Sequence, residues 1–383
     1  MSPELPELPA RSVAVVLGTR PELVKLAPVI HRLGSSARLI HTGQHGDEAM
    51  SGRFVAELGL PAPELLRSVG GTSRAVQIAR SLEQLDALFG EHPPAAVVVQ
   101  GDTNATLAGA LAANARSIPL VHVEAGLRSH DPAMPEEHNR VLVDSIADVL
   151  CAATPENRAN LLAEGTDPAR ITLTGNTVVE AVQRHLPPAE RREALLTHHG
   201  LEPDHYILAT LHRPENTDDT ATLRTVLTEL AALATDDLPV LLPLHPRTRA
   251  RIEEADLGGL LDGVTVLAPL GYGEFLALAR HAALLISDSG GIQEECTVLG
   301  RPLIVVRRST ERPESMAHFA HLVPPGPRIG RLARHRLAQG AHGLRLLERT
   351  PSPYGDGRAA QRIAALVTAL VRPAARDAAA LAA

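Results

Sequence analysis

The chain has 383 residues, of which 44% are hydrophobic, and a formal net charge of -7. This length predicts two domains, and the negative net charge argues against a nucleic-acid or anionic-membrane partner. The amino terminus lacks the basic and apolar regions of a signal peptide, and no apolar run approaches the roughly 20 residues of a membrane span. We therefore expect a cytoplasmic protein. The two cysteines, Cys151 and Cys296, predict buried thiols rather than a disulfide framework.

Short apolar runs alternate with helical patterns along the chain. The first predicted strands are Val13–Leu17, Arg38–His41, Ala95–Val99, Leu120–Val123 and Ile171–Leu173, separated by predicted helices at Leu23–Leu33, Arg74–Phe89 and Thr106–Ala115. After the polar stretch Gln183–Asp204, strands are predicted at Tyr206–Leu211, Val240–Leu244, Val264–Leu267, Ala283–Ile286 and Leu303–Val306, and a last helix at Ala359–Leu370. This alternation is typical of βαβ units, so we predict an α/β protein with largely parallel sheets.

The restart of the pattern sets the predicted domain limits. We expect an N-terminal domain over residues 1–183, a C-terminal domain over 184–358, and a helix with a loose tail over 359–383 that packs back on the N-terminal domain. Ligands of open α/β sheets bind at the carboxyl ends of the strands, so polar residues at those ends are candidate site residues.

Residues 286–295, Ile-Ser-Asp-Ser-Gly-Gly-Ile-Gln-Glu-Glu, are the most informative stretch. An apolar strand ends there in small residues, and a helix begins. Free N–H groups at a helix start attract an anion, and glycines let a phosphate approach closely. The other interpretation is an ordinary turn in which serine and aspartate cap the helix. The residues alone leave both interpretations open.

Three carboxylates follow strands of the first half: Asp102, Glu124 and Glu136. Groups of this kind within reach of a substrate proton can perform acid–base chemistry. Asp102 and Glu136 are equally well explained as helix-start residues. Glu124 directly follows an apolar strand, so we favour a functional role for it, with Arg128 or Arg140 as its partner.

His212 and His245 follow strands of the second half, where a histidine can carry a proton or bind a phosphate. The first predicted strand leads to Gly-Thr-Arg-Pro-Glu, not to the G-x-G-x-x-G of a dinucleotide site. A Walker A motif and a zinc-type Cys/His spacing are also missing. We therefore expect neither a cofactor nor a metal.

Ten short motifs in order carry a resemblance to a known family. They are GTRPE at 18–22, GQH at 43–45, GDT at 101–103, HVEAGLR at 122–128, PEE at 135–137, GNT at 175–177, HRPEN at 212–216, SDSGGIQEE at 287–295, TERPE at 310–314 and PYGDG at 353–357. The series resembles UDP-N-acetylglucosamine 2-epimerases across nearly the whole chain. The resemblance implies a GT-B architecture, with two facing Rossmann-like domains and the active site between them, and suggests a homodimer.

The resemblance also implies roles for individual residues. The family's catalytic residues fall on Asp102, Glu124, Glu136 and His212, its UDP contacts on Arg20, Ser289, Gly290 and Glu295, and further substrate-binding positions on Arg140, His245 and Arg312. The implied reaction interconverts UDP-N-acetylglucosamine and UDP-N-acetylmannosamine by elimination and re-addition of UDP. The alternatives are a hydrolysing epimerase that releases N-acetylmannosamine and UDP, a GT-B glycosyltransferase, and a non-catalytic UDP-sugar-binding protein.

One segment departs from the family pattern. Gly46 follows His45 where nonhydrolysing bacterial members carry arginine, and no arginine occurs in Val69-Gly70-Gly71-Thr72. The resemblance therefore does not imply activation by a second UDP-sugar.

Overall fold

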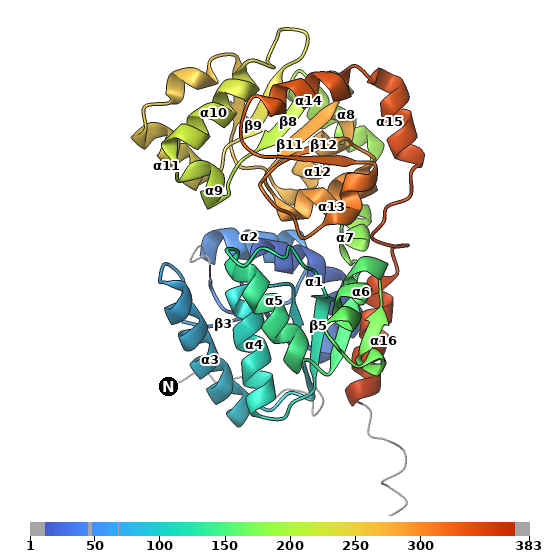
Figure 1. The fold of residues 1–383 in the computed structure, drawn as a ribbon. Helices are drawn as coiled ribbons and strands as arrows, with labels where there is room; N and C mark the ends of the chain where they lie inside the picture. Colours follow the sequence, from blue (N-terminus) through green and yellow to red (C-terminus); the bar gives the residue numbers. More distant parts are fainter. Residues whose placement is uncertain (1–11, 45–47, 68, 372–383) are drawn as a thin grey trace, which may run out of the picture. The chain divides into compact units, whose positions relative to one another are not determined.

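The computed structural model describes residues 12–44, 48–67 and 69–371 (Figure 1). The chain divides into two compact units. Unit 1 runs to Ala181 and resumes at Tyr354, and unit 2 is Val182–Pro353. Each unit contains one parallel sheet, which confirms the predicted α/β class with two parallel sheets. The Pro-Tyr-Gly-Asp-Gly loop at 353–357, expected in the second domain, belongs to unit 1 from Tyr354 onward.

The sheet of unit 1 has seven strands in the order β3-β2-β1-β4-β5-β6-β7. They are β1 (Val13–Leu17), β2 (Ala37–His41), β3 (Glu64–Leu65), β4 (Ala96–Gln100), β5 (Leu120–Ala125), β6 (Val149–Ala152) and β7 (Ile171–Leu173). The sequence did not predict β3 or β6. Because the strand order reverses between β1 and β4, a ligand crevice is expected at the carboxyl ends of these strands.

Helices cover both faces of this sheet. They are α1 (Arg20–Leu33), α2 (Glu48–Glu57), α3 (Arg74–Glu91), α4 (Asn104–Ala115), α5 (Pro135–Ile146), α6 (Pro155–Ala163), α7 (Val178–His185) and α16 (Ala359–Val371), with 3-10 turns at Gly34–Ser36 and Pro168–Arg170. Right-handed crossovers on either side of the reversal place α1 and α4 on opposite faces. Helices α3, α4 and α5 pack side by side, and α16 packs against α1 (Figure 1).

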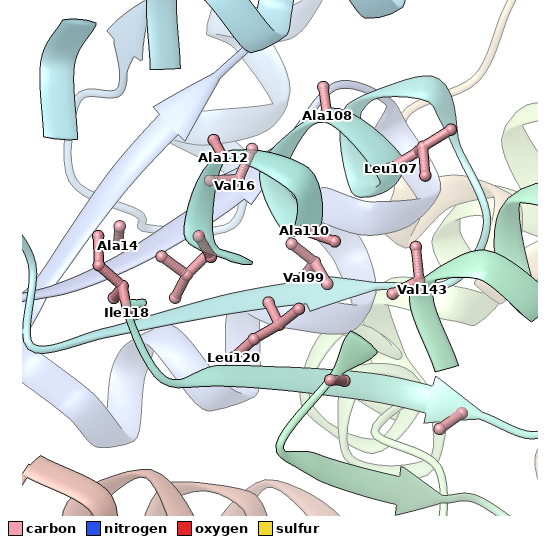
Figure 2. Packing of buried hydrophobic residues seen from close by; sticks show 14 of the residues in the cluster. Ala14, Val16, Val99, Leu107, Ala108, Ala110, Ala112, Ile118, Leu120 and Val143 are labelled. Atoms are coloured by element: carbon pink, nitrogen blue, oxygen red, sulfur yellow. The ribbon is translucent and has the colours of Figure 1, made fainter. Parts of the chain in front are cut away.

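Small residues bring α4 close to the strands that lead into the candidate site. Ala108, Ala110 and Ala112 of α4 are fully buried in the core cluster (Figure 2). A Cβ added to Gly109 would lie 3.0 Å from Val99 Cγ1 and 3.1 Å from Val16 Cβ. This close contact fixes the distance between α4 and the sheet. The first turn of α4 begins two residues after Asp102.

The sheet of unit 2 has six strands in the order β10-β9-β8-β11-β12-β13. They are β8 (Ile207–Thr210), β9 (Val240–Pro243), β10 (Val264–Leu267), β11 (Leu284–Ser287), β12 (Leu303–Val306) and β13 (Ala320–Val323), of which β13 was not predicted. The order reverses between β8 and β11, so a second crevice is expected at their carboxyl ends.

Unit 2 has eight α-helices after α7. They are α8 (Ala189–His198), α9 (Pro214–Thr217), α10 (Thr220–Ala231), α11 (Pro246–Glu254), α12 (Tyr272–His281), α13 (Gly290–Leu299), α14 (Arg328–Leu337) and α15 (Gly340–Arg349), with 3-10 turns at Gly258–Leu261 and Pro313–Ala317. Its core gathers aliphatic side chains from β8, β9, β11 and β12 under α10 and α14.

Cys151 and Cys296 are buried free thiols, as predicted. Within the described ranges, no helix is long and apolar enough to cross a membrane. The same residues contain no cluster of three or more histidine, cysteine, aspartate or glutamate side chains suited to a metal ion.

Candidate active site

The strand ends of unit 1 bring two predicted carboxylates onto neighbouring strands. Asp102 follows β4 by two residues, and Glu124 lies near the end of β5, which pairs with β4 through Gln100 and Val123. Glu136 lies in the first turn of α5, and α5 packs against α4.

Glu124 occupies an unusual backbone conformation. Its φ is 65°, and the pairing of β5 with β6 shifts register between Val123 and Ala125, so Glu124 forms a bulge. A non-glycine residue with positive φ inside a strand is rare and costs conformational energy, and such strain is commonly found at functional sites. Because of the bulge, the Glu124 side chain does not follow the regular alternation of β5 side chains between the two faces of the sheet.

The Glu124 side chain is 3% exposed and is held by three other polar side chains. Lys25 of α1 forms an ion pair with Oε1, Asn176 Nδ2 donates to the same oxygen at 2.6 Å, and Gln100 donates to Oε2. A buried charge needs such partners, because desolvation strongly disfavours an isolated one. The sequence suggested Arg128 or Arg140 as the partner, whereas the structure shows Lys25.

Lys25 is the chain's only lysine, and it lies in an apolar run of α1 at 4% exposure. A lone lysine on the buried face of a helix was the available signal for its role. The sequence analysis also assigned no role to Gln100 or Asn176. Asn176 belongs to the GNT motif at 175–177, which was the available signal for it, whereas Gln100 gives none because amides are common at strand ends.

Asp102 does not cap α4. The cap is Thr103, whose hydroxyl accepts from Thr106 N at 3.1 Å, while the Asp102 carboxylate contacts the Arg140 guanidinium. Its side chain retains 21% exposure, so it is supported by an arginine and still accessible. The helix-cap interpretation of Asp102 is therefore wrong.

Glu136 and Glu137 differ sharply in their surroundings. Glu137 is buried and accepts hydrogen bonds from Ser129 N at 3.0 Å and His130 N at 3.0 Å, and it pairs with Arg140. Burial alone would raise the pKa of Glu137, but these bonds and the arginine hold it below its ordinary value. Glu136 is half-buried, and among the described residues its carboxylate has no hydrogen-bond partner. Glu137 therefore organises the loop, while Glu136 is available for chemistry.

Arg140 lies with its guanidinium between the carboxylates of Asp102 and Glu137 and is 1% exposed. In this position it can orient Asp102, whereas direct contact with a substrate would require it to emerge from the protein. Arg20, by contrast, is exposed at the start of α1, with its guanidinium 4.5 Å from the centre of the Phe54 ring. The two arginines are therefore suited to different tasks.

The strand ends of unit 2 bring together the predicted histidines. The rings of His212, after β8, and His245, after β9, lie 6.5 Å apart. His245 Nδ1 accepts from Arg247 N at 3.2 Å and thereby caps α11. The side chain of His212 is 42% exposed, and its Nδ1 lies 3.0 Å from Asp288.

Asp288 is fully buried and holds the loop that carries His212. Its carboxylate accepts from the backbone N–H of His212 at 3.1 Å and of Arg213 at 3.0 Å, and from Asn216 Nδ2 at 3.1 Å. Burial would raise the pKa of Asp288, but its hydrogen bonds with His212, the Arg213 N–H and Asn216 hold it below its ordinary value. An ionised Asp288 fixes the proton of His212 on Nδ1 and leaves Nε2 on the exposed side.

The helix start at Gly290 lacks the cap that the plain-turn interpretation requires. Within the part of the chain that the structure describes, Ser289 is the N-cap residue and makes no side-chain cap hydrogen bond. Asp288 points to the 212–216 loop instead, and the Ser287 hydroxyl accepts from Ser289 N at 3.0 Å. The first-turn N–H groups of α13 are thus not consumed by a cap, which favours the anion-binding interpretation.

Two carboxylates of α13 have separate partners. Glu295 is 9% exposed and accepts from the Tyr272 hydroxyl at 3.1 Å. Glu294 is fully buried and accepts from Arg312 Nε at 2.7 Å, and Arg312 also pairs with Glu311. Arg312 passes close to the helix start, since a Cβ on Gly290 would lie 3.0 Å from its Nη1. His45, of the GQH motif, lies outside the described residues.

Comparison with known proteins finds relatives over nearly the whole chain. The family model described as UDP-N-acetylglucosamine 2-epimerase matches residues 30–368. The UDP-N-acetylglucosamine 2-epimerase of Methanocaldococcus jannaschii is 37% identical over 93% of this chain and 98% of its own length. A UDP-2,3-diacetamido-2,3-dideoxy-D-glucuronate 2-epimerase of Pseudomonas aeruginosa is 35% identical over 92% of this chain and 98% of its own.

A solved structure extends the comparison to the fold. The Methanocaldococcus jannaschii UDP-GlcNAc 2-epimerase, in complex with UDP-GlcNAc and UDP, matches with a TM-score of 0.81 and 36% identity over 94% of this chain and 99% of that chain. The predicted GT-B fold class is thereby confirmed. With a family model over nearly the whole chain and relatives of this identity, the chain belongs to the UDP-N-acetylglucosamine 2-epimerase family.

Proposed function

We propose that this protein interconverts UDP-N-acetylglucosamine and UDP-N-acetylmannosamine by inverting C2 of the sugar. The observation that carries the proposal is the placement of Asp102 and Glu124 on adjacent strand ends, in a chain of this family. Glu124 is held by Lys25 on a strained bulge, and Asp102 is supported by Arg140. Paired carboxylates with different surroundings suit a reaction that removes a proton and returns it.

The proposed route needs no acidifying carbonyl. A carboxylate takes the proton from C2, the C–H electron pair forms the C1=C2 double bond, and the C1–O bond breaks so that UDP leaves with that electron pair. UDP then adds back to C1 of the 2-acetamidoglucal, and a proton is delivered to C2 on the opposite face. The two faces require two acid–base groups, which we assign among Asp102, Glu124 and Glu136.

We assign UDP binding chiefly to unit 2. The uncapped N–H of Gly290 at the start of α13, together with the Ser289 hydroxyl, would hold a phosphate, and Glu295 would accept from a ribose hydroxyl. His212, oriented by Asp288, is placed to stabilise the charge that develops on the departing diphosphate. We assign further substrate contacts to Arg20, His245 and Arg312. The buried Arg140 acts on the substrate through Asp102 and not by direct contact.

The test is a product analysis by NMR, with UDP-N-acetylglucosamine and UDP-N-acetylmannosamine as separate substrates. We expect both to reach the same mixture of the two nucleotide sugars. Glu124→Gln should bind UDP normally and lose turnover. Accumulation of UDP with free N-acetylmannosamine would instead identify a hydrolysing enzyme, and no turnover of either substrate would contradict the proposal.

The Pseudomonas aeruginosa relative supports a second candidate substrate, a UDP-2,3-diacetamido-2,3-dideoxyhexuronate. Direct comparison of kcat/KM for the two substrates distinguishes them, and we expect the simpler acetamido sugar to be preferred. A cytoplasmic location and a homodimer stay predictions.

A further inference from the structure

A buried histidine lies directly below the two strand ends that carry Asp102 and Glu124. His122 is in β5, fully buried, and each of its ring nitrogens meets an acceptor. Nδ1 lies 2.7 Å from Asp144 Oδ1, and Nε2 lies 2.8 Å from the carbonyl oxygen of Gly101.

These two contacts determine the charge of the ring. A neutral imidazole carries one N–H and therefore can donate to only one acceptor. Its other nitrogen would then point its lone pair at the lone pair of the second acceptor. In a buried site without water, this repulsive and unsatisfied contact costs free energy. Both contacts are hydrogen bonds when His122 carries a proton on each nitrogen.

The surroundings of His122 supply the compensating charge. Asp144 Oδ2 accepts from Gly126 N at 3.1 Å and lies 2.8 Å from Arg128 Nη2, and Arg128 also pairs with Glu164 at 2.6 Å. Burial would raise the pKa of Asp144, but the charges and hydrogen bonds of His122 and Arg128 hold it below its ordinary value. A charged His122 makes this group of four neutral, with two cations and two anions.

The group ties together the backbone on both sides of the reaction centre. The carbonyl of Gly101, which accepts from His122, immediately precedes Asp102. The N–H of Gly126, which donates to Asp144, follows Glu124 by two residues. The backbone of Glu124 is strained at φ 65° and needs such restraint to hold its position.

We propose that His122 is held as an imidazolium by Asp144 and acts as a positioning residue, fixing the Asp102 and Glu124 carboxylates relative to each other. It does not exchange protons with substrate, because it is fully buried and both nitrogens are engaged. This inference rests on the proposed roles of Asp102 and Glu124 in the epimerisation.

The first test is the protonation state itself, measured by side-chain 15N NMR of the wild-type protein near neutral pH. We expect His122, assigned through bonds to its backbone, to show a proton on each nitrogen and two imidazolium-type 15N shifts. One protonated and one bare nitrogen would overturn the proposal. This readout does not depend on activity, so it stands or fails separately from the proposed function.

The second test is kinetic. His122→Gln and Asp144→Asn should each lower kcat by about 100-fold, as a misplacement on the order of 1 Å does, with UDP affinity unchanged within about twofold. His31→Gln is the control, since its Nε2 also contacts a backbone carbonyl, that of Leu58 at 3.0 Å, but far along α1 from the strand ends. Wild-type kcat in folded His122→Gln or Asp144→Asn would refute the positioning role, whereas an inactive wild type would refute the proposed function instead.

Discussion

The buried carboxyl of Glu22 should make unit 1 less stable as the pH rises from 5 to 8. Glu22 is 2% exposed, and its oxygens accept from Gly18 N at 3.0 Å and from the hydroxyls of Thr19 and Thr103 at 2.9 Å each. Burial raises the pKa of Glu22 from 4.5 to about 7, and these bonds offset only part of that effect. The Thr106 hydroxyl has one proton and two acceptors, Gln100 O at 2.7 Å and Glu22 at 3.2 Å, so it cannot fully serve the carboxylate.

The sign and size of the effect follow from proton linkage. Between pH 4.5 and about 7 the folded state keeps the Glu22 proton while the unfolded chain releases it. The folded state then binds more protons, so the free energy of unfolding falls as the pH rises. The contribution is complete below pH 4.5 and is lost as the pH rises through 7. Between pH 5 and pH 8 the loss is on the order of 2–3 kcal/mol.

Glu22→Gln removes the titration and keeps the shape of the side chain. The difference in unfolding free energy between variant and wild type, measured by urea denaturation of the unit 1 transition, should shift in favour of the variant by roughly 2–3 kcal/mol from pH 5 to pH 8. Glu91→Gln, at an exposed position at the end of α3, is the control. Parallel stability curves for Glu22→Gln and wild type would refute the reasoning.

Three further predictions concern single contacts. Lys25→Met leaves Glu124 without its cation and should destabilise unit 1 by about 3 kcal/mol. Adding Glu124→Gln should recover much of this loss, because the double variant has no buried charge left unpaired. Additive losses in the double-mutant cycle would contradict the ion pair. Asp288→Asn should lower kcat/KM at least about 100-fold, because His212 loses the carboxylate that orients its ring; a wild-type kcat/KM in the variant would argue against this. Gly290→Ala should destabilise unit 2 by about 1–2 kcal/mol, because the added Cβ displaces Arg312. The control is Gly291→Ala, whose Cβ meets only Ser289 Oγ at 3.9 Å and whose unfolding free energy should stay within about 0.5 kcal/mol of the wild-type value. Equal losses of stability in the two variants would contradict the contact with Arg312.

Much of the fold follows from the sequence pattern. Val13–Leu17 was predicted to the residue, because an unbroken apolar, valine-rich run that ends at a glycine has few alternatives. The strands β3, β6 and β13 were missed. The first is two residues long, and Val149–Ala152 and Ala320–Val323 are four-residue segments whose composition suits a helix equally well.

The candidate site was predictable in its location but not in its contacts. Strand ends and ordered motifs selected Asp102, Glu124 and His212, since those signals are local. The partner of Glu124 lies 99 residues away in α1, and the partner of His212 lies 76 residues away. Asp288 was assigned to the phosphate turn, yet its carboxylate faces a different loop. Only the folded sheet brings these pairs together.

The most direct test of the account is epimerisation of UDP-N-acetylglucosamine in deuterated water. Elimination of UDP requires that the C2 proton leave on one face and that a new one arrive on the other. The elimination route predicts UDP-N-acetylmannosamine with deuterium at C2, observed by NMR and mass spectrometry. UDP-N-acetylmannosamine that forms without deuterium at C2 would contradict the central claim.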